Sequence, residues 1–170
     1  MSDFADALAL QIPRLRRYAR ALTHDVSWAD DLVQDTLERA LQRRWLFRLN
    51  SNLTAWLFTM LYRLYLNEAK RRSAVTVMDD DEAPEPAVAG DPALQLDMRR
   101  ALDCLSPEHR AVIVLIGLEQ MSYQEAAAVL DVPVGTVMSR LTRARARLRA
   151  LLSGHPLTSG ESAPHLTRIK

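Results

Sequence analysis

The chain has 170 residues, 48% of them hydrophobic and 25% charged, which suits a soluble protein of one domain or two small ones and excludes a fibrous or wholly disordered chain. Its 22 Lys and Arg against 21 Asp and Glu give a formal net charge of +1, so a uniformly basic polyanion-binding protein is also excluded. The charge is uneven: residues 1–72 carry a net +4, residues 73–98 hold seven acids and no base, and residues 99–170 carry a net +4. Two basic blocks therefore flank an acidic connector, and this asymmetry is informative about partners.

A single cysteine, Cys104, excludes an intramolecular disulfide, and the four histidines show no metal-ligand spacing with it. We therefore expect a reducing cytoplasm, no metal and no cofactor. The N-terminus is acidic where a signal peptide is basic, and no apolar run approaches the roughly 18 residues that span a bilayer. Helical spacing predicts that Cys104 is a small buried apolar residue.

Apolar residues recur at three- and four-residue steps over residues 8–22, which predicts a first helix. Pro13 lies inside this pattern and is expected to kink or divide it. A second helix has its apolar face over residues 32–41, and Ser27 is its expected N-cap because an acid stands three residues later, as in a capping box. Residues 44–52 hold two aromatics and an Asn-Ser-Asn cluster and are interpreted as a loop.

The helical pattern returns over residues 53–72. Residues 73–92 lack apolar periodicity and hold four successive acids, three prolines and a glycine, which is typical of a flexible linker. A second helical unit follows over residues 93–152, and residues 153–170, with two Gly and two Pro, are predicted to be a disordered tail.

Within the second unit, Ser106 followed by a proline predicts an N-cap and the first residue of a helix that ends near residues 117–119. Ser122 opens a regular capping box and a short helix that ends near Leu130, and a last helix is expected over residues 134–152. The sequence shows no strand pattern. The predicted fold class is all-α: two small helical domains joined by a flexible linker, the C-terminal one containing a helix-turn-helix.

Residues 122–149 carry the helix-turn-helix pattern, in which small residues of the first helix let the second cross it closely and enter the major groove of DNA. Arg140 and Arg143 lie one turn apart near the start of the second helix, and we favour DNA contact for both. Other groups there that could reach phosphates or base edges are Val134, Gly135, Thr136 and Ser139. An ordinary solvated face explains Arg145, Arg147 and Arg149 at least as well.

On the helix over residues 53–72, Trp56, Arg63 and Lys70 stand seven residues apart on one face, with Asn67 and Arg71 beside them. Cations interleaved with aromatics suit single-stranded nucleic acid, because the cations follow phosphates while exposed rings stack on unpaired bases. Packing is nevertheless the default interpretation of Trp56, Phe58 and Tyr65. Packing explains the loop aromatics Trp45 and Phe47 less easily.

Residues 30–38 present carboxylates beside an apolar stripe of the second helix. No His, Gly-rich phosphate loop or nucleophile motif accompanies them, so a protein-docking face fits better than acid–base or metal chemistry. Asp30 and Asp31 also stabilise the start of a helix electrostatically, which is an alternative reason for their presence.

Taken together, these segments resemble bacterial sigma factors of the extracytoplasmic-function (ECF) group, in the sigma-70 family. The resemblance covers residues 8–152 in the correct order. It is carried by Asp30-Asp-Leu-Val-Gln-Asp-Thr, Trp56-Leu-Phe with Lys70-Arg-Arg, Leu105-Ser-Pro-Glu, Ser122-Tyr-Gln-Glu-Ala-Ala, and Val132-Pro-Val-Gly-Thr-Val-Met-Ser-Arg-Leu.

The resemblance implies a region 2 over residues 5–72, which binds the clamp of the largest subunit of core RNA polymerase and captures the melted −10 promoter element. It implies a region 4 over residues 93–152, which reads the −35 element as duplex and contacts the flap of the second-largest subunit. The acidity of residues 73–92 agrees with a linker that follows a nucleic-acid path inside the polymerase. The chain itself is expected to be no enzyme, and to act in a stress response under an anti-sigma factor.

The site residues implied by the resemblance fall into three groups. Those expected to bind polymerase are Asp30, Asp31, Gln34, Asp35 and Glu38. Those expected at the melted −10 strand are Trp45, Phe47, Asn50, Arg63, Asn67, Lys70 and Arg71. Those expected at the duplex −35 element are Val134, Thr136, Met138, Ser139, Arg140 and Arg143.

Two positions depart from the family pattern. The family often has Asn where this chain has Arg63, and Arg or Lys where it has Met138, although a methionine could touch a thymine methyl. These two departures keep open the alternative of a sigma-like mimic that titrates an anti-sigma factor. A second alternative is a stand-alone helix-turn-helix regulator, although the docking face at residues 30–38 and the helix over residues 53–72 argue against it. The sequence also leaves open whether the two domains pack together.

Overall fold

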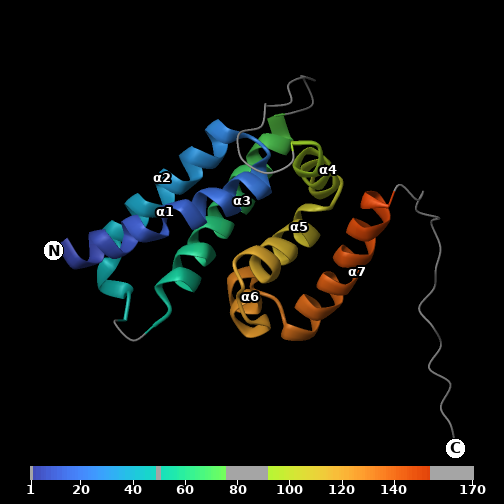
Figure 1. The fold of residues 1–170 in the computed structure, drawn as a ribbon. Coiled ribbons are helices and arrows are strands. Elements are labelled where there is room, and N and C mark those ends of the chain that lie inside the picture. Colours follow the sequence, from blue (N-terminus) through green and yellow to red (C-terminus); the bar gives the residue numbers. More distant parts are fainter. Residues whose placement is uncertain (1, 49–50, 76–91, 154–170) are drawn as a thin grey trace, which may run out of the picture.

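The computed structural model describes residues 2–48, 51–75 and 92–153, and within these ranges every regular element is helical (Figure 1). The expected all-α fold is confirmed. In chain order the elements are α1 (Ser2–Thr23), α2 (Val26–Gln42), the short 3₁₀ turn η1 (Arg44–Leu46), α3 (Leu53–Val75), α4 (Pro92–Asp103), α5 (Pro107–Ile113), the π-helical turn η2 (Val114–Leu118), α6 (Tyr123–Leu130) and α7 (Val134–Leu152).

The first unit is the bundle of α1, α2 and α3, whose apolar faces pack against one another. Leu15, Tyr18 and Phe58 are fully buried there, and the Tyr18 and Phe58 rings lie 5.0 Å apart between centroids. Burial raises the pKa of the Tyr18 hydroxyl well above its ordinary value, and the neighbouring Tyr62 and Tyr65 add to the effect. The packing interpretation of Phe58 and Tyr65 is thus confirmed, and Trp56 is half-buried against the same core.

One local expectation for this unit was wrong, and another was wrong in part. Asp25, not Ser27, is the N-cap of α2, and its carboxylate accepts a hydrogen bond from the Trp28 N–H at 2.9 Å. The helix starts earlier because a carboxylate there satisfies one of the free N–H groups of its first turn. Pro13 does not divide α1, which is one helix of 22 residues.

In the second unit, α4 to α7, the observed helix caps agree with those predicted from the sequence. Ser106 caps α5 with Pro107 at its first position, and Ser122 and Glu125 form the predicted capping box of α6. One expectation was wrong: Cys104 is exposed, because it lies just beyond α4 in the turn that leads to α5.

The predicted linker and tail lie mostly outside the described residues. Helix α3 continues to Val75, three residues past its predicted end, and α4 begins at Pro92. Nothing in the described ranges tests the character of residues 76–91 or 154–170.

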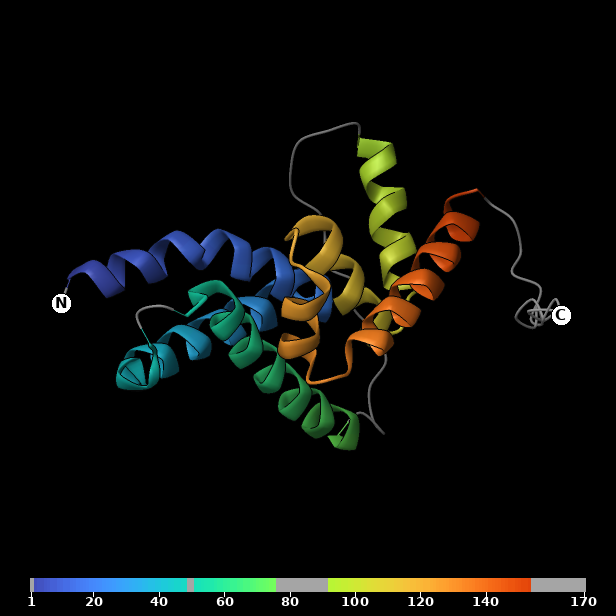
Figure 2. The same ribbon diagram turned by 90° about the horizontal axis from the view of Figure 1, so that it is seen from below.

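The two units pack together. Helix α3 lies against α6, and α1 lies against α5, so that the second unit covers one side of the first (Figures 1 and 2). A single apolar cluster runs through both units and joins Leu15 and Tyr18 of α1 to Val112 and Leu115 of the second. The question that the sequence left open is therefore answered in favour of contact.

A buried arginine ties the second unit to α1. The side chain of Arg110 on α5 donates to the carbonyl oxygens of Leu22 at 3.0 Å, Leu102 at 3.0 Å and Leu105 at 2.8 Å. Only 5% of Arg110 is exposed. The guanidinium thus lies where α1 and α4 end, and their free carbonyls carry the negative pole of each helix, which stabilises the buried charge.

Two further contacts cross between the units at their edges. His24, which links α1 to α2 with a φ of 55°, is hydrogen-bonded through Nδ1 to the carboxylate of Asp103 at the end of α4, at 2.5 Å. Asn52 donates from Nδ2 to Glu125 Oε1 at 2.6 Å while its own Oδ1 accepts from the Ala55 N–H at the start of α3. The first turns of α3 and α6 are therefore joined.

The contact of His24 predicts a pH-dependent stability. Burial, and then the nearby Arg110, lower the pKa of His24 below its ordinary value, although Asp103 opposes them. The unfolded chain therefore binds more protons just below pH 6.5, and stability must fall as the pH drops through that window. We expect urea unfolding to show a smaller loss between pH 7 and pH 5.5 in His24→Asn, a residue that tolerates a positive φ.

The matched control is His109→Asn, because burial also lowers the pKa of His109 but that side chain lies outside the contact with α1. His109→Asn should remove only the part of the pH-dependent loss of stability that His109 itself causes. An unchanged loss of stability in His24→Asn would contradict the prediction.

Candidate nucleic-acid interface

The second unit presents a helix-turn-helix formed by α6 and α7. Ala126 and Ala127 are buried where the two helices meet, and Val137, Leu141 and Ala144 are buried on the inner face of α7, as expected. Asp131 adopts the left-handed conformation, with φ 54° and ψ 50°, and its N–H bonds back to the Ala127 carbonyl. This closes α6 and lets the chain turn directly into α7.

The outer face at the start of α7 is accessible. Met138 is 47% exposed, and Ser139 and Arg143 are exposed beside it. Thr136 is half-buried, and Val134 packs against the apolar core, so its side chain is less available than the sequence indicated. The predicted −35 residues thus divide into an exposed group and one, Val134, that supports the helix.

Arg140 differs from its neighbours. Its side chain is only 20% exposed and lies 3.5 Å from the carboxylate of Glu108 on α5. It also lies close enough to Tyr62 of α3 to oppose the rise that burial causes in the pKa of that hydroxyl. Arg140 is therefore less accessible than Met138, Ser139 and Arg143.

The structure adds Arg147 to the basic face of α7. Together with Arg140 and Arg143, it lies near His109, and the three guanidiniums reinforce the lowering of that histidine's pKa by burial. The spacing of three and four residues among these arginines places them on one helical face, and this spacing is the sequence signal that identifies Arg147 as part of it.

In the loop of the first unit, the two aromatics have different environments. Trp45 on η1 is 77% exposed. The ring of Phe47 packs between those of Phe4 and Trp56, with centroids 5.8 Å and 5.3 Å away. Phe47 therefore anchors the loop to α1 and α3, whereas the Trp45 side chain is left exposed. Asn50 lies outside the described residues.

The polar face of α3 is exposed as predicted. Arg63, Asn67, Lys70 and Arg71 are all exposed along one side of the helix. From Trp56, where the loop is anchored, to Lys70 the helix rises about 21 Å. The face is thus long enough to follow several nucleotides of a single strand.

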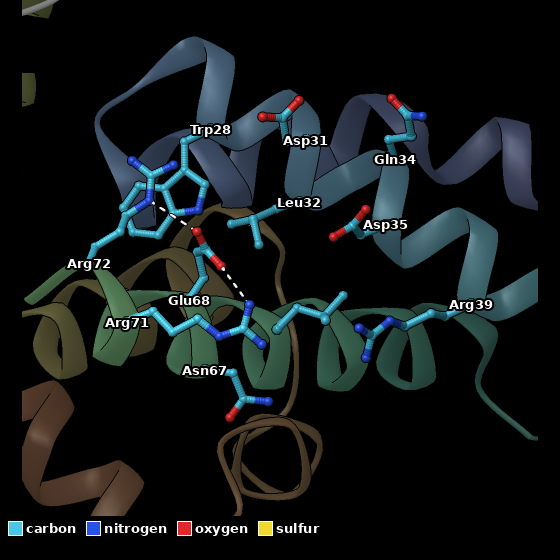
Figure 3. A pocket seen from close by; sticks show the side chains of 11 residues that line it. Trp28, Asp31, Leu32, Gln34, Asp35, Arg39, Asn67, Glu68, Arg71 and Arg72 are labelled. Carbon is cyan, nitrogen blue, oxygen red and sulfur yellow. Dashed lines mark hydrogen bonds and ion pairs between the residues drawn. The ribbon is translucent and has the colours of Figure 1, made fainter. Parts of the chain in front are cut away.

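The structure brings together two sets of residues that the sequence kept apart. A groove of about 390 Å³ between α2 and α3 is lined by Asp31, Gln34 and Asp35 on one side and by Asn67 and Arg71 on the other (Figure 3). Figure 3 shows Asp31 and Gln34 on the outer side of α2, where a partner could reach them.

The end of the groove is held by side chains of α3. Arg72 stacks over the Trp28 ring at 4.0 Å and pairs with Glu68 at 3.4 Å, and Arg71 reaches Glu68 at 3.8 Å (Figure 3). Arg72 and Glu68 therefore fix the end of α3 to the start of α2, and Arg71 shares this network.

The remaining candidate polymerase-binding residues on α2 lie in different surroundings. Glu38 is exposed and accepts a hydrogen bond from Gln34 at 3.0 Å, so these two lie on the outer face. Asp30 is half-buried and turned toward α1, where Arg16 lies 3.4 Å from its carboxylate. Asp30 is thus tied into the bundle, whereas Asp31, Gln34, Asp35 and Glu38 present a surface.

Neither a metal site nor a membrane span is found in the part of the chain that the structure describes. No group of three or more His, Cys, Asp or Glu in these ranges could hold a metal ion. Within the same ranges, each helix is too short or too polar to cross a membrane.

Comparison with known proteins agrees with this geometry. Residues 8–62 match the family model for the Sigma2 domain of PhyR, and residues 95–148 match that for Sigma-70, region 4. The chain is 38% identical over 152 residues to the ECF RNA polymerase sigma factor EcfG of Rhodopseudomonas palustris, an alignment that covers 86% of this chain and 83% of that protein.

Solved structures show the same arrangement. The sigma factor RpoE of Bartonella quintana, in complex with the anti-sigma factor NepR, superposes with a TM-score of 0.81 at 39% identity, over 90% of this chain and 98% of that one. CnrH in complex with the cytosolic domain of CnrY gives 0.68 at 31% identity, over 89% and 88%. The chain therefore belongs to the ECF group of RNA polymerase sigma factors, which are transcription initiation factors and not enzymes.

Proposed function

We propose that this sigma factor directs core RNA polymerase to specific promoters by reading the −35 element with residues 93–152 and capturing the melted −10 strand with residues 5–72. The observation that carries the proposal is the presence, in one chain, of an exposed recognition helix, an exposed Trp45 and an exposed cationic face on α3. The first suits duplex DNA and the second suits unpaired bases.

At the −35 element, α7 enters the major groove with its first turns. Arg143 is exposed and can offer its guanidinium to a guanine or a phosphate, and Met138 can touch a thymine methyl. Arg140 has to turn away from Glu108 to reach the DNA, which lies within the reach of its long side chain.

At the −10 element, Trp45 offers a stacking surface for an extruded base, and Arg63, Asn67 and Lys70 follow the strand along α3. Unstacking a base costs a few kcal/mol, which contacts with the protein and with polymerase must offset. Because residues 1–72 and residues 99–170 each carry a net charge of only +4, DNA binding by the free chain should be weak and sensitive to salt.

The outer face of α2, formed by Asp31, Gln34, Asp35 and Glu38, is the proposed contact with the clamp of the largest polymerase subunit. The groove that this face shares with Asn67 and Arg71 supports the assignment, because polymerase binding and strand capture would then occur side by side. The flap of the second-largest subunit is the proposed contact of the second unit. Its residues in that contact are not assigned.

Control by an anti-sigma factor is part of the proposal. The support is the co-crystal structure of the sigma factor RpoE compared above, in which RpoE is bound by the anti-sigma factor NepR. A stress signal that releases such a partner would then switch on the genes that this chain serves.

The experiment that tests the function is transcription in vitro with purified core polymerase on a library of randomised promoters. We expect transcripts only when the chain is added, and enrichment of two short motifs separated by a constant spacer. Absence of transcripts at saturating chain would contradict the proposal.

One observation favours a second candidate function. The first unit matches the Sigma2 domain of PhyR, and PhyR is named as an anti-anti-sigma factor in its complex with NepR. A chain of this kind would bind an anti-sigma factor without activating polymerase. The same transcription experiment separates the two functions, because a mimic would leave core polymerase inactive at every promoter.

The −35 assignment predicts that Arg140→Ala lowers transcription from the best promoter by about 5- to 150-fold, the range for loss of one bidentate base contact. The loss should be confined to promoters with the selected upstream motif. Arg145→Ala on the same helix is the control and should change transcription by less than about threefold. Equal losses in both variants would contradict a specific role of Arg140.

The −10 assignment predicts that Trp45→Ala impairs strand opening, measured as permanganate reactivity of unpaired thymines near −10. Loss of one base–aromatic stack corresponds to about 5- to 150-fold. Binding to core polymerase should be unchanged, because Trp45 lies outside the α2 face. Leu46→Ala, at the neighbouring exposed position, is the control, and wild-type opening in Trp45→Ala would contradict the assignment.

A further inference from the structure

A buried carboxylate joins the two units. Glu119, at the end of η2, has a side chain with 0% exposure. Its Oε2 accepts from Arg14 Nε at 2.7 Å, and its Oε1 accepts from Arg17 Nε at 2.8 Å. Arg14 also donates from Nη2 to the main-chain oxygen of Glu119 at 3.1 Å. Both arginines belong to α1, so two cations of the first unit hold one anion of the second.

These contacts serve the association of the units and not the fold of either one. In the described residues, every hydrogen bond to the Glu119 carboxylate comes from α1. The arginine side chains are 35% and 49% exposed, so water can solvate them when the units separate. A separated Glu119 would likewise be solvated, and no buried charge would be left unpaired.

In the closed arrangement, in which the two units are packed together, the DNA-reading surfaces are too close to reach both promoter elements. Elements centred at −35 and −10 are about 25 base pairs apart, which is roughly 85 Å along a duplex. Helices α3 and α7 both contact α6, and the three helices laid end to end would measure only about 75 Å. The reading residues lie closer still, because those of α7 are in its first turns, next to α6.

The closed arrangement also restrains both reading surfaces. Asn52, at the end of the −10 loop, is hydrogen-bonded at 2.6 Å to Glu125, in the first turn of the helix-turn-helix. The same interface that shortens the molecule therefore occupies residues at the edge of each DNA-binding surface.

From these observations we propose that Arg14, Arg17 and Glu119 form a latch that holds the two units of the free chain together. While the units are held together the chain cannot bind both promoter elements, and core polymerase separates them. The latch rests on the proposed function, because it matters only if the two units bind separated elements. Binding of each unit to its own polymerase surface provides the differential affinity that opens the chain.

The test compares three substitutions. Glu119→Gln keeps the size of the side chain but removes its charge, and Arg17→Gln removes one cation whose recorded contacts are with Glu119. The matched control is Arg16→Gln, because Arg16 is on the same helix but pairs with Asp30 inside the first unit. Circular dichroism confirms that each variant is folded, and Arg17, being half-exposed, is the safer of the two latch substitutions.

The measurement is energy transfer between dyes on the two units of the full chain. The dyes are attached at Leu10→Cys, a position 77% exposed on α1, and at Met98→Cys, 38% exposed on α4, after Cys104→Ser has removed the native thiol. We expect high transfer in the free chain, low transfer on addition of core polymerase, and an open-to-closed ratio raised about tenfold or more by Glu119→Gln. Arg17→Gln should act in the same direction and Arg16→Gln should have no effect.

Unchanged transfer in both latch variants would overturn the proposal, as would high transfer in a complex that is transcribing. Transcription with the unlabelled wild-type chain separates the two failures. If it yields no transcripts, the proposed function fails, whereas normal transcripts with unchanged transfer would disprove only the latch.

Discussion

The arrangement of the molecule depends on charged groups that are buried where the two units meet. Glu119 of the second unit lies between Arg14 and Arg17 of α1, and Arg110 of the second unit lies among carbonyl oxygens at the ends of α1 and α4. Neither charge could be buried without its partners across the interface. The first helix therefore packs both within its own bundle and against α5 and η2 of the second unit.

The fold was predictable where local signals determine it. The capping residues Ser106 and Ser122 and the inward-facing Val137, Leu141 and Ala144 lie where their patterns indicated. Local patterns could not predict the interface, because Arg110 and Glu119 are polar residues in apolar segments and their partners lie roughly 90 to 105 residues away. Ser27 and Asp25 were both suitable as the N-cap of α2, and spacing alone did not show that Asp25 would cap it.

The residue types of the candidate site could be predicted from the sequence. Which of these residues are exposed and which are packed against other helices could not. Trp45 and Phe47 look alike in the sequence, yet one is exposed and the other is packed between two rings. Asp30 and Asp31 are adjacent, yet Asp30 turns toward Arg16 and Asp31 lines the groove with α3. These differences arise from packing between helices, which a single sequence does not display. One member of each pair is thus packed within the first unit, and the other is left accessible.

The central claim is that one chain holds two separated promoter elements at once within the polymerase complex. The most direct measurement is photo-crosslinking from one position in each unit to a single promoter, with a photoreactive residue in place of Met138 on α7 or of Leu46 on η1. Our account predicts that, with core polymerase present, the first position crosslinks to bases near −35 and the second to bases near −10 of the same DNA. Crosslinks from both positions to one element, or the same pattern without polymerase, would contradict it.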